Sequence, residues 1–326
     1  MALLNSSIQI GPCHLANRLV LPPMATSKAV QGAVSQELLE YYRQKTAGQH
    51  IGLVISEHAY VNLQGRASEH QLSASRDEDV AGLTALTELI HQSGSRVFLQ
   101  ISHAGGRAKS ANPLAPSAMA GAEGIMAQAM TPKQIDQVVE DFAMAAGRAK
   151  AAGFDGVEIH SAHGYLLNQF YSPLINRRSD EYGLDLDGRI RLHLRIIARV
   201  REQIGNDLAL LVRLGVCDQE EGGSTVQDAL RACAAFEQAG VDGLDISGGM
   251  KGYLRSGHSE QGYYQDYTEQ IKNNVSLPVI LTGGIQDALE AERLLQENKA
   301  DLIGVGRAIL KGSDWPQQAW ARLASL

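Results

Sequence analysis

The sequence predicts an α/β protein of the (β/α)8 TIM-barrel class, with residues 1–326 forming a single barrel domain. The first observation behind this prediction is that eight short apolar segments alternate with segments of helical periodicity. The second is an internal echo, because Ala152–His160 and Ala239–Ser247 share a helix end, an Asp-Gly turn and a short apolar strand. The third is length, since 326 residues exceed the ~250 that such a barrel commonly needs.

The eight predicted strands are apolar runs without strict alternation of polar and apolar residues. Strands of this kind are buried on both faces, as in a parallel sheet. In chain order they are Arg18–Leu21, Leu53–Glu57, Val97–Ile101, Gly156–Ile159, Leu208–Arg213, Gly243–Ile246, Pro278–Leu281 and Leu302–Val305. A doubly wound sheet is the alternative, but no Gly-x-Gly-x-x-Gly motif opens a helix after any of these strands.

Helices are expected between the strands, and the clearest one begins at Thr131 and Pro132. Threonine is a favourable N-cap, and proline is favoured at the first helical position. The apolar residues that follow share one helical face: Ile135, Val138, Val139, Phe142, Ala145 and Ala149. Before the first strand, residues 8–17 are expected to form a short hairpin that closes the barrel floor.

Composition limits the function. The net charge is −7, which does not favour the clustered Lys and Arg surface of a nucleic-acid-binding protein. The three cysteines, Cys13, Cys217 and Cys233, have no spacing typical of zinc, an iron–sulfur cluster or a disulfide framework. No run of about 18 apolar residues could span a bilayer, and the N-terminus lacks the features of a signal peptide. We therefore expect a soluble cytoplasmic protein without a metal site and without nucleic-acid or membrane partners.

The loops after the last two predicted strands indicate a phosphate site. In a barrel, functional groups lie at the carboxyl ends of the strands, and phosphate is often bound after strands 7 and 8. Glycines let backbone N–H groups approach phosphate oxygens, and arginine adds a charged fork. These loops supply Gly283, Gly284, Gly306 and Arg307. Either glycine pair alone would be read as an ordinary turn, but their joint position favours phosphate binding.

Three groups that can hold or move protons follow the fourth predicted strand: His160, His163 and Tyr165. A metal site is one interpretation, but no third ligand is evident. Two polar residues that merely line a turn are another. The third is a pair of imidazole N–H donors aimed at a substrate oxygen that becomes negative, with the tyrosine as a nearby acid.

Two further polar residues sit at predicted strand ends. Gln100 offers a donor and an acceptor, which suit the edge of an amide-like heterocycle, although it could equally be an ordinary buried amide. Arg213 could form a salt bridge with Glu158 or Asp245 on neighbouring strands. As a permanent cation at the barrel mouth, it could also stabilise an anionic cofactor or intermediate.

These residues stand in motifs that resemble the old yellow enzyme family of FMN-dependent ene-reductases (NADH:flavin oxidoreductases). The resemblance runs nearly end to end, and its most specific part is the segment His160–Leu167. Other matching segments are Asn17–Met24, Gln100 with His103–Gly105, Phe170–Pro173, Asn176 with Arg178, Asp180–Gly183, Arg213 and Gly304–Arg307.

The resemblance implies a bound FMN, NADH or NADPH as reductant, and a small activated alkene as substrate. It implies that the flavin contacts the backbone of Pro23, Met24 and Ala25, the amide of Gln100 and the cation of Arg213. The FMN phosphate would be held by Gly283, Gly284, Gly306 and Arg307. His160 and His163 would bind the substrate oxygen, and Tyr165 would donate the proton.

The chain also departs from the family pattern. Ala25 stands where members commonly carry Thr or Cys, Ser27 where one subgroup has tyrosine, and Gly183–Arg189 replaces a usual Gly-Gly-Ser-x-Glu-Asn-Arg stretch. The iron–sulfur and second dinucleotide domains of larger relatives are not expected, nor is an arginine-bearing tail. Another electron acceptor, a non-redox phosphate-binding barrel enzyme, a tRNA-reducing flavoprotein and a non-catalytic flavin protein remain as alternatives. The choice between NADH and NADPH, the alkene and a homo-oligomeric state are left open.

Overall fold

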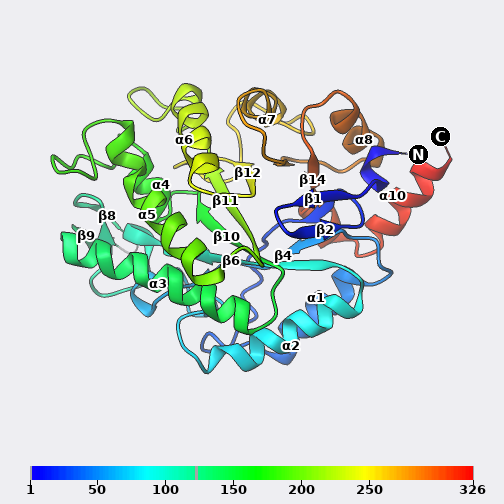
Figure 1. Ribbon diagram of the computed structural model, residues 1–326, viewed down its shortest axis with the longest axis horizontal. Helices are drawn as coiled ribbons and strands as arrows, with labels where there is room; N and C mark the ends of the chain where they lie inside the picture. The colour runs from blue at the N-terminus through cyan, green and yellow to red at the C-terminus, as the bar shows by residue number, and fades with distance from the viewer. Residues whose placement is uncertain (1, 122–123, 326) are drawn as a thin grey trace.

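The computed structural model describes residues 2–121 and 124–325, in which eight parallel strands close into a barrel (Figure 1). Around the barrel these strands are β3 (Leu19–Leu21), β4 (Leu53–Ile55), β6 (Arg96–Ser102), β10 (Gly156–Ser161), β11 (Ala209–Gly215), β12 (Gly243–Ser247), β13 (Val279–Thr282) and β14 (Leu302–Gly304). The last strand pairs with the first, in parallel. The predicted (β/α)8 class is therefore confirmed, and each predicted strand overlaps one of these eight.

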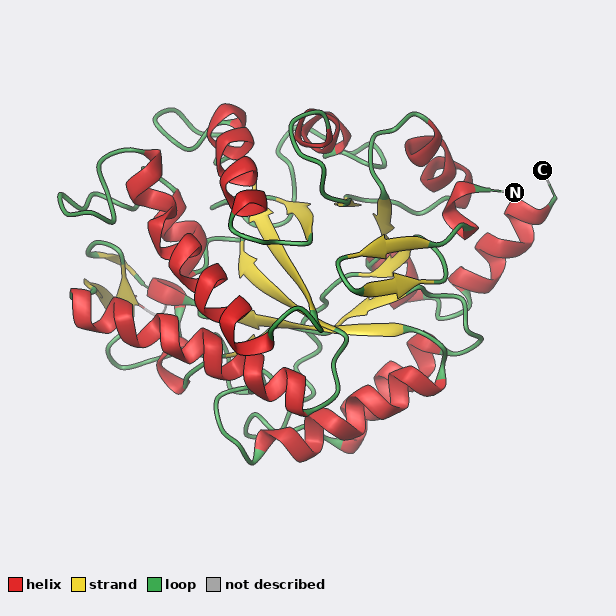
Figure 2. Cartoon of the chain, in the orientation of Figure 1, coloured by secondary structure: helices red, strands yellow, loops and turns green. Residues whose placement is uncertain are grey.

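Helices surround the strands (Figure 2). They are α1 (Gln36–Thr46), α2 (Asp79–Gln92), α3 (Pro132–Ala151), α4 (Leu166–Tyr171), α5 (Leu186–Ile204), α6 (Val226–Gln238), α7 (Gln265–Lys272), α8 (Ala288–Gln296), α9 (Arg307–Lys311) and α10 (Trp315–Ala324). Helices α3 and α5 pack side by side along much of their length (Figure 1). None of the helices within the described ranges combines the length and apolar character that crossing a bilayer requires.

Helix α3 begins where the sequence predicts it. The Thr131 side chain accepts a hydrogen bond from the backbone of Gln134, whose side chain in turn accepts one from the backbone of Thr131. This reciprocal capping satisfies two of the N–H groups that a helix start leaves unpaired. The six apolar residues predicted on one face are all buried.

The repeated Asp-Gly turn has a structural role. The Asp155 carboxylate, just before β10, accepts a hydrogen bond from the Val97 N–H of the neighbouring β6, with an N···O distance of 2.9 Å. Asp242, just before β12, accepts one from Leu210 of β11 at 2.8 Å, and also binds Arg201. Each aspartate thus fixes the start of an adjacent strand, which explains why the motif recurs.

The predicted hairpin forms from β1 (Ile8–Ile10) and β2 (Cys13–Leu15), which pair antiparallel. Its inward side chains are buried at the barrel floor with residues from five or more barrel strands. This cluster consists of Ile10, Cys13, Leu15, Val20, Leu53, Ile55, Phe98, Ala209, Leu211, Ile280 and Leu302. The hairpin therefore closes the end of the barrel from which the strands start.

Short elements fill the loops at the opposite end, where the strands finish. They are the strands β5 (Ala59–Tyr60), β7 (Leu114–Ala115), β8 (Met119–Ala120) and β9 (Met126–Ala129) and the 3-10 turns η2 (Leu63–Gly65) and η3 (Gly105–Arg107). A further 3-10 turn, η1 (Leu3–Asn5), precedes the hairpin. Because the loops with extra structure follow strand ends, they build up the rim where a barrel places its chemistry.

Candidate active site

A cavity of about 600 Å³ lies at the carboxyl ends of the barrel strands. Its size falls within the range of roughly 300–1,000 Å³ that is typical of ligand pockets. Residues within or just after each of the eight barrel strands contribute to it. The residues that line the cavity include Pro23, Met24, Ala25, His58, Gln100, Arg107, His160, His163, Tyr165, Arg213, Ser247, Tyr253, Thr282, Gly284, Gly304, Gly306, Arg307 and Lys311.

The site residues predicted from the sequence come together here, with one exception. Gly283 is not among the residues that line the cavity. A Cβ placed on Gly283 would instead lie 3.2 Å from the ring of Tyr263. Its neighbour Gly284 does line the cavity, and its φ of +69° explains why glycine stands there.

The rings of His160, at the end of β10, and of His163 and Tyr165, just after it, form one compact group. The His160 ring centroid is 5.0 Å from that of His163 and 5.2 Å from that of Tyr165. Burial is the largest cause that lowers the pKa of both imidazoles well below the usual value. Both rings are therefore neutral near pH 7 and can donate N–H hydrogen bonds without carrying a charge.

Local contacts fix the orientation of His163. Its Nε2 lies 2.6 Å from the Oγ of Ser247 at the end of β12. Its backbone has a φ of +58°, an uncommon conformation for a residue other than glycine. The next residue, Gly164, is also left-handed, and a Cβ there would clash with the guanidinium of Arg107. Arg107 in turn donates to the His163 carbonyl at 2.9 Å, which holds this turn in place.

Tyr165 keeps its proton at neutral pH. Burial raises the pKa of its phenol above the usual value, although the Arg107 cation opposes the shift. A neutral phenol beside two neutral imidazoles can donate a proton to a carbon that gains negative charge.

A buried charge network lies beside these rings. The Arg213 Nε is 3.2 Å from an Asp245 carboxylate oxygen, so the predicted salt bridge is present while the guanidinium also lines the cavity. The Gln100 amide donates to Glu158 at 2.5 Å. Burial, reinforced by Asp245, raises the pKa of Glu158 to about 8, and burial raises that of Asp245 to about 6. Glu158 therefore holds its proton near pH 7, and the Arg213 guanidinium is paired with the carboxylate of Asp245.

The other end of the cavity is cationic and rich in glycine. Arg307 and Lys311 both line it, one helical turn apart at the start and end of α9. Gly306 precedes this helix, and a Cβ there would press against the Met24 sulfur at 2.9 Å. Glycines that leave the backbone accessible beside two cations are suited to hold a phosphate.

The loop after β3 is held in place by a hydrogen bond to a buried carboxylate. The Thr26 N–H donates to the Glu57 carboxylate at 2.7 Å. Glu57 is itself buried, and burial raises the pKa of its carboxyl. Thr26 is therefore held toward Glu57, while Pro23, Met24 and Ala25 line the cavity.

Sequence reasoning missed His58 and Lys311. His58 directly follows the predicted strand Leu53–Glu57, just as His160 directly follows Gly156–Ile159. Applying the same rule about strand ends to this strand would have found it. Lys311 gave no such signal, because it reaches the cavity from the last turn of α9 and not from a strand end.

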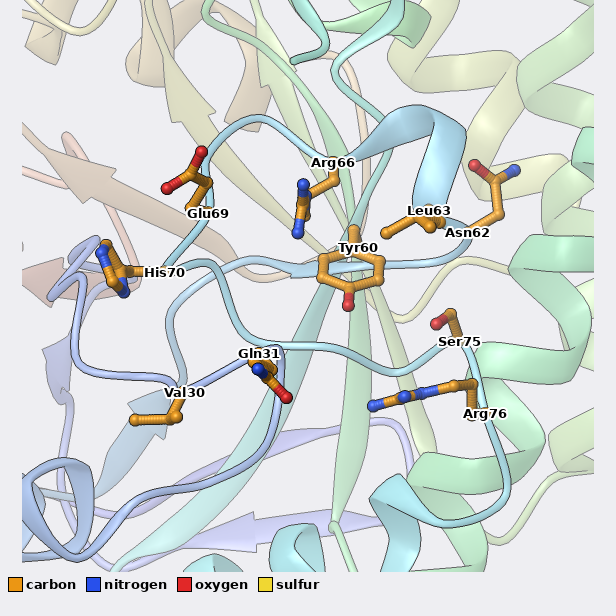
Figure 3. A pocket seen from close by; sticks show the side chains of 10 residues that line it. All are labelled: Val30, Gln31, Tyr60, Asn62, Leu63, Arg66, Glu69, His70, Ser75 and Arg76. Atoms are coloured by element: carbon orange, nitrogen blue, oxygen red, sulfur yellow. The ribbon is translucent and has the colours of Figure 1, made fainter. Parts of the chain in front are cut away.

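A second cavity of about 670 Å³ lies outside this group, between residues 30–31 and 60–76 (Figure 3). It is lined by Val30, Gln31, Tyr60, Asn62, Leu63, Arg66, Glu69, His70, Ser75 and Arg76. One of its cations, Arg76, is already paired with Asp79 at 3.1 Å. Although this cavity is larger, it contains neither the histidine pair nor Tyr165, so the candidate active site is the cavity at the strand ends.

The residues of that cavity fit FMN. The phosphate group matches the end formed by Gly284, Gly306, Arg307 and Lys311. The heteroaromatic ring matches the end formed by the amide of Gln100 and the cation of Arg213. Thr282, the last residue of β13, has a buried hydroxyl without a hydrogen-bond partner among the described residues. The barrel and its two-ended cavity thus define a protein suited to a phosphorylated heteroaromatic cofactor.

Comparison with known proteins identifies the family. The profile of the NADH:flavin oxidoreductase / NADH oxidase family matches residues 4–325. An NADPH dehydrogenase of Halalkalibacterium halodurans is 36% identical over 323 residues, covering 98% of this chain and 94% of the relative. An NADH oxidase of Thermoanaerobacter brockii is 38% identical over 323 residues, covering 95% of this chain but 50% of the relative. The chain thus spans only half the length of that second relative.

Solved structures agree. An old yellow enzyme homologue from Zymomonas mobilis has a TM-score of 0.84 at 26% identity, covering 98% of this chain and 92% of that one. Morphinone reductase in complex with tetrahydroNAD also has a TM-score of 0.84 at 26% identity, covering 99% and 91%. The chain therefore belongs to the NADH:flavin oxidoreductase / NADH oxidase family, the old yellow enzyme family of FMN-dependent oxidoreductases that use NADH or NADPH. The predicted resemblance is confirmed.

Proposed function

We propose that residues 1–326 form one catalytic domain that reduces the C=C bond of activated alkenes such as enones, nitroalkenes and maleimides. NADH or NADPH is the electron source, and FMN is the bound cofactor. The observation that carries this proposal is the group of His160, His163 and Tyr165 rings, packed 5.0 and 5.2 Å apart at the mouth of the FMN-compatible cavity.

FMN, when bound, supplies hydride exchange between the nicotinamide and the substrate. The chain holds it through the backbone of Pro23, Met24 and Ala25, the Gln100 amide and the Arg213 cation. Gly284, Gly306 and Arg307 hold the phosphate, with Gly283 supporting that turn. The role of Arg213 follows from its place, because it is a buried guanidinium that lines the cavity and is held there by its ion pair with Asp245.

His160 and His163 bind the oxygen of the activating group. The Nδ1 of His160 is buried without a partner among the described residues, which leaves Nε2 as the nitrogen available to the cavity. As neutral donors the two rings stabilise negative charge that develops on that oxygen. Removing one preorganised donor of this kind typically slows a reaction by about 10²–10³-fold.

Tyr165 donates the proton to the α-carbon of the alkene. Its raised pKa keeps the phenol protonated, and the adjacent histidines place the activating group next to it. The phenolate that remains is reprotonated from solvent before the next turnover. The two bonds that form, C–H from hydride and C–H from the phenol, together account for reduction of the double bond.

The experiment that tests this function separates the two half-reactions of the FMN-loaded enzyme by stopped-flow absorbance. Tyr165→Phe should slow reoxidation by cyclohex-2-enone at least about 10²-fold, because proton donation contributes about 10²–10⁴-fold. Reduction by NADH or NADPH should change by less than about twofold, since that step needs no proton from the phenol.

Tyr253→Phe is the matched control, because it removes a second phenol from the same cavity, 6.3 Å from His163. It should leave both half-reactions within about threefold of the unmodified enzyme, a loss no larger than a peripheral hydrogen bond. Equal slowing of both half-reactions by Tyr165→Phe would contradict the assignment of Tyr165 as the proton donor.

A further inference from the structure

His58 is a cavity residue to which the proposed reaction gives no role. It follows β4, lines the cavity, and is only half-buried. Its ring centroid is 5.5 Å from that of Tyr165 and 6.4 Å from that of His160. Tyr165 therefore has one imidazole at 5.2 Å, at the end of β10, and a second at 5.5 Å, in the loop after β4.

The contacts of Gln71 determine which nitrogen of His58 carries the proton. The Gln71 side chain is buried, with its Oε1 accepting from the Ala67 N–H at 2.6 Å. Its Nε2 lies 2.6 Å from the His58 Nδ1 and 3.2 Å from the His58 carbonyl oxygen. Turning the amide over would set two donors against each other at Ala67 and two acceptors at the carbonyl. Gln71 is thus the donor, and His58 Nδ1 is the acceptor.

A neutral imidazole whose Nδ1 accepts must carry its proton on Nε2. Burial, aided by Arg213, lowers the pKa of His58 to about 4, so the ring is neutral at physiological pH. Within the described residues the Nε2 makes no hydrogen bond, and it is not among the buried nitrogens. It is therefore a free N–H donor on a ring that lines the cavity.

We propose that His58 is a substrate-binding residue whose Nε2–H donates to a second acceptor group, so that the site favours alkenes activated on both carbons. This rests on the proposed function. His160 and His163 bind the first activating group, Tyr165 serves the α-carbon beside it, and the His58 ring lies 5.5 Å from the same phenol and 6.4 Å from the His160 ring. An alkene flanked by two carbonyls, as in a maleimide, presents acceptors in both directions, whereas a simple enone presents one.

The test compares N-methylmaleimide with cyclopent-2-enone on the FMN-loaded enzyme. His58→Phe keeps a ring of similar shape but removes the N–H. It should lower kcat/KM for the maleimide about tenfold, the loss typical of one hydrogen bond, and that for the enone less than about twofold. Equal changes with both alkenes, or no change with either, would overturn the proposal.

Gln71→Glu tests the same donor without altering His58. The new carboxylate can still accept from Ala67 but can no longer donate to His58 Nδ1, so the neutral ring moves its proton to Nδ1. Histidine ¹⁵N NMR of the FMN-loaded protein should show the Nε2–H form of His58 in the unmodified enzyme and its loss in the variant. An Nδ1–H form in the unmodified enzyme would overturn the proposal.

Binding of unreactive probes distinguishes failure of this inference from failure of the proposed function. Succinimide has two carbonyls and 2-pyrrolidinone has one, and each can be titrated by the change in flavin absorbance. His58→Phe should weaken the binding of succinimide about tenfold and the binding of 2-pyrrolidinone by less than about twofold. If the enzyme reduces neither alkene, the proposed function fails, while these titrations still decide the role of His58. Equal weakening of both probes would refute it.

Discussion

At the scale of single residues, the candidate site depends on neutral donors kept neutral by burial. His58, His160 and His163 all have lowered pKa values, and the phenol of Tyr165 has a raised one. None of these groups carries charge near pH 7, so their effect is exerted through directed hydrogen bonds. The positive charge that lines the cavity comes from the basic side chains Arg107, Arg213, Arg307 and Lys311.

Ala25 stands at a position where the resemblance to the family leads us to expect Thr or Cys. Its methyl group lines the cavity and cannot donate a hydrogen bond. Ala25→Thr would place a hydroxyl beside the flavin. A hydrogen bond from this hydroxyl to the flavin would favour the reduced form, because such a bond strengthens as the flavin gains electrons. The midpoint potential should rise by roughly 20 mV, which corresponds to about 1 kcal/mol for a two-electron couple. Spectroelectrochemistry of the FMN-loaded protein measures this.

Ala25→Val is the matched control, since valine has nearly the shape of threonine but no hydroxyl. Its potential should stay with that of the unmodified protein. Potentials that are equal in Ala25→Thr and Ala25→Val would show that the hydroxyl does not reach the flavin.

Most of the site could be predicted from residue types at strand ends, because a barrel brings those ends together whatever the loops do. That rule located His160, Gln100 and Arg213 at the cavity. It could not show that Gln71, thirteen residues beyond His58 and outside any strand, fixes the ring of His58. Such contacts depend on how a loop folds back, for which the sequence carries no periodic signal.

At the scale of elements, the repeated Asp-Gly motif helped to predict the strands that follow it, and the structure gives it a structural function. A third aspartate, Asp301, repeats the arrangement by accepting from the Val279 N–H at 2.9 Å, just before β14. Each of these aspartate–backbone hydrogen bonds acts as a clamp between two neighbouring strands, and the three clamps join β6 to β10, β11 to β12 and β13 to β14. The sequence pattern predicted the eight strands to within a few residues. It did not predict β5 or β7 to β9, which are too short to show alternation.

Removing one clamp should destabilise the barrel measurably. In Asp242→Ala the Leu210 N–H loses its acceptor and Arg201 loses its ion pair. We expect the free energy of unfolding to fall by about 2 kcal/mol, as hydrogen bonds to charged groups contribute about 1.5–3 kcal/mol. Urea denaturation followed by circular dichroism measures the change.

Asp207→Ala is the control for that experiment, because within the described part of the chain Asp207 forms one ion pair, with Lys150, and its side chain is 80% exposed. Exposed pairs contribute roughly 0–1 kcal/mol. If the two variants lose the same stability, Asp242 acts as a surface charge and not as a clamp.

At the scale of the whole molecule, the number of buried neutral histidines governs the response to pH. Burial lowers the pKa of His58 and His103 to about 4 and that of His193 to about 3, and those of His160 and His163 also lie well below the usual value. In the unfolded chain each would titrate near 6.5. These groups therefore contribute stability that is present above pH 6.5 and is lost as the pH falls.

The buried carboxyls act in the opposite direction. The pKa of Glu158 is raised to about 8 and that of Asp245 to about 6, so the folded state holds protons that the unfolded state releases. Their contribution is present at low pH and is lost as the pH rises through those values. Burial also raises the pKa of the Glu57 carboxyl, which acts in the same direction. Because five histidines outnumber these three carboxyls, the histidines dominate below pH 6.5, and stability should be greatest near pH 7.

His193 allows this balance to be tested away from the cavity. It lies on α5, contacts the Ser161 hydroxyl at 2.8 Å and stacks on Phe236 with ring centroids 5.5 Å apart. The free energy of unfolding of the FMN-saturated protein, measured in urea, should fall steeply between pH 6 and pH 5. His193→Gln, which keeps an amide for Ser161, should reduce that slope by about one proton, or about 1.4 kcal/mol per pH unit. His14→Gln, which replaces an exposed histidine, is the control. An unchanged slope in His193→Gln would mean that His193 is protonated in the folded protein.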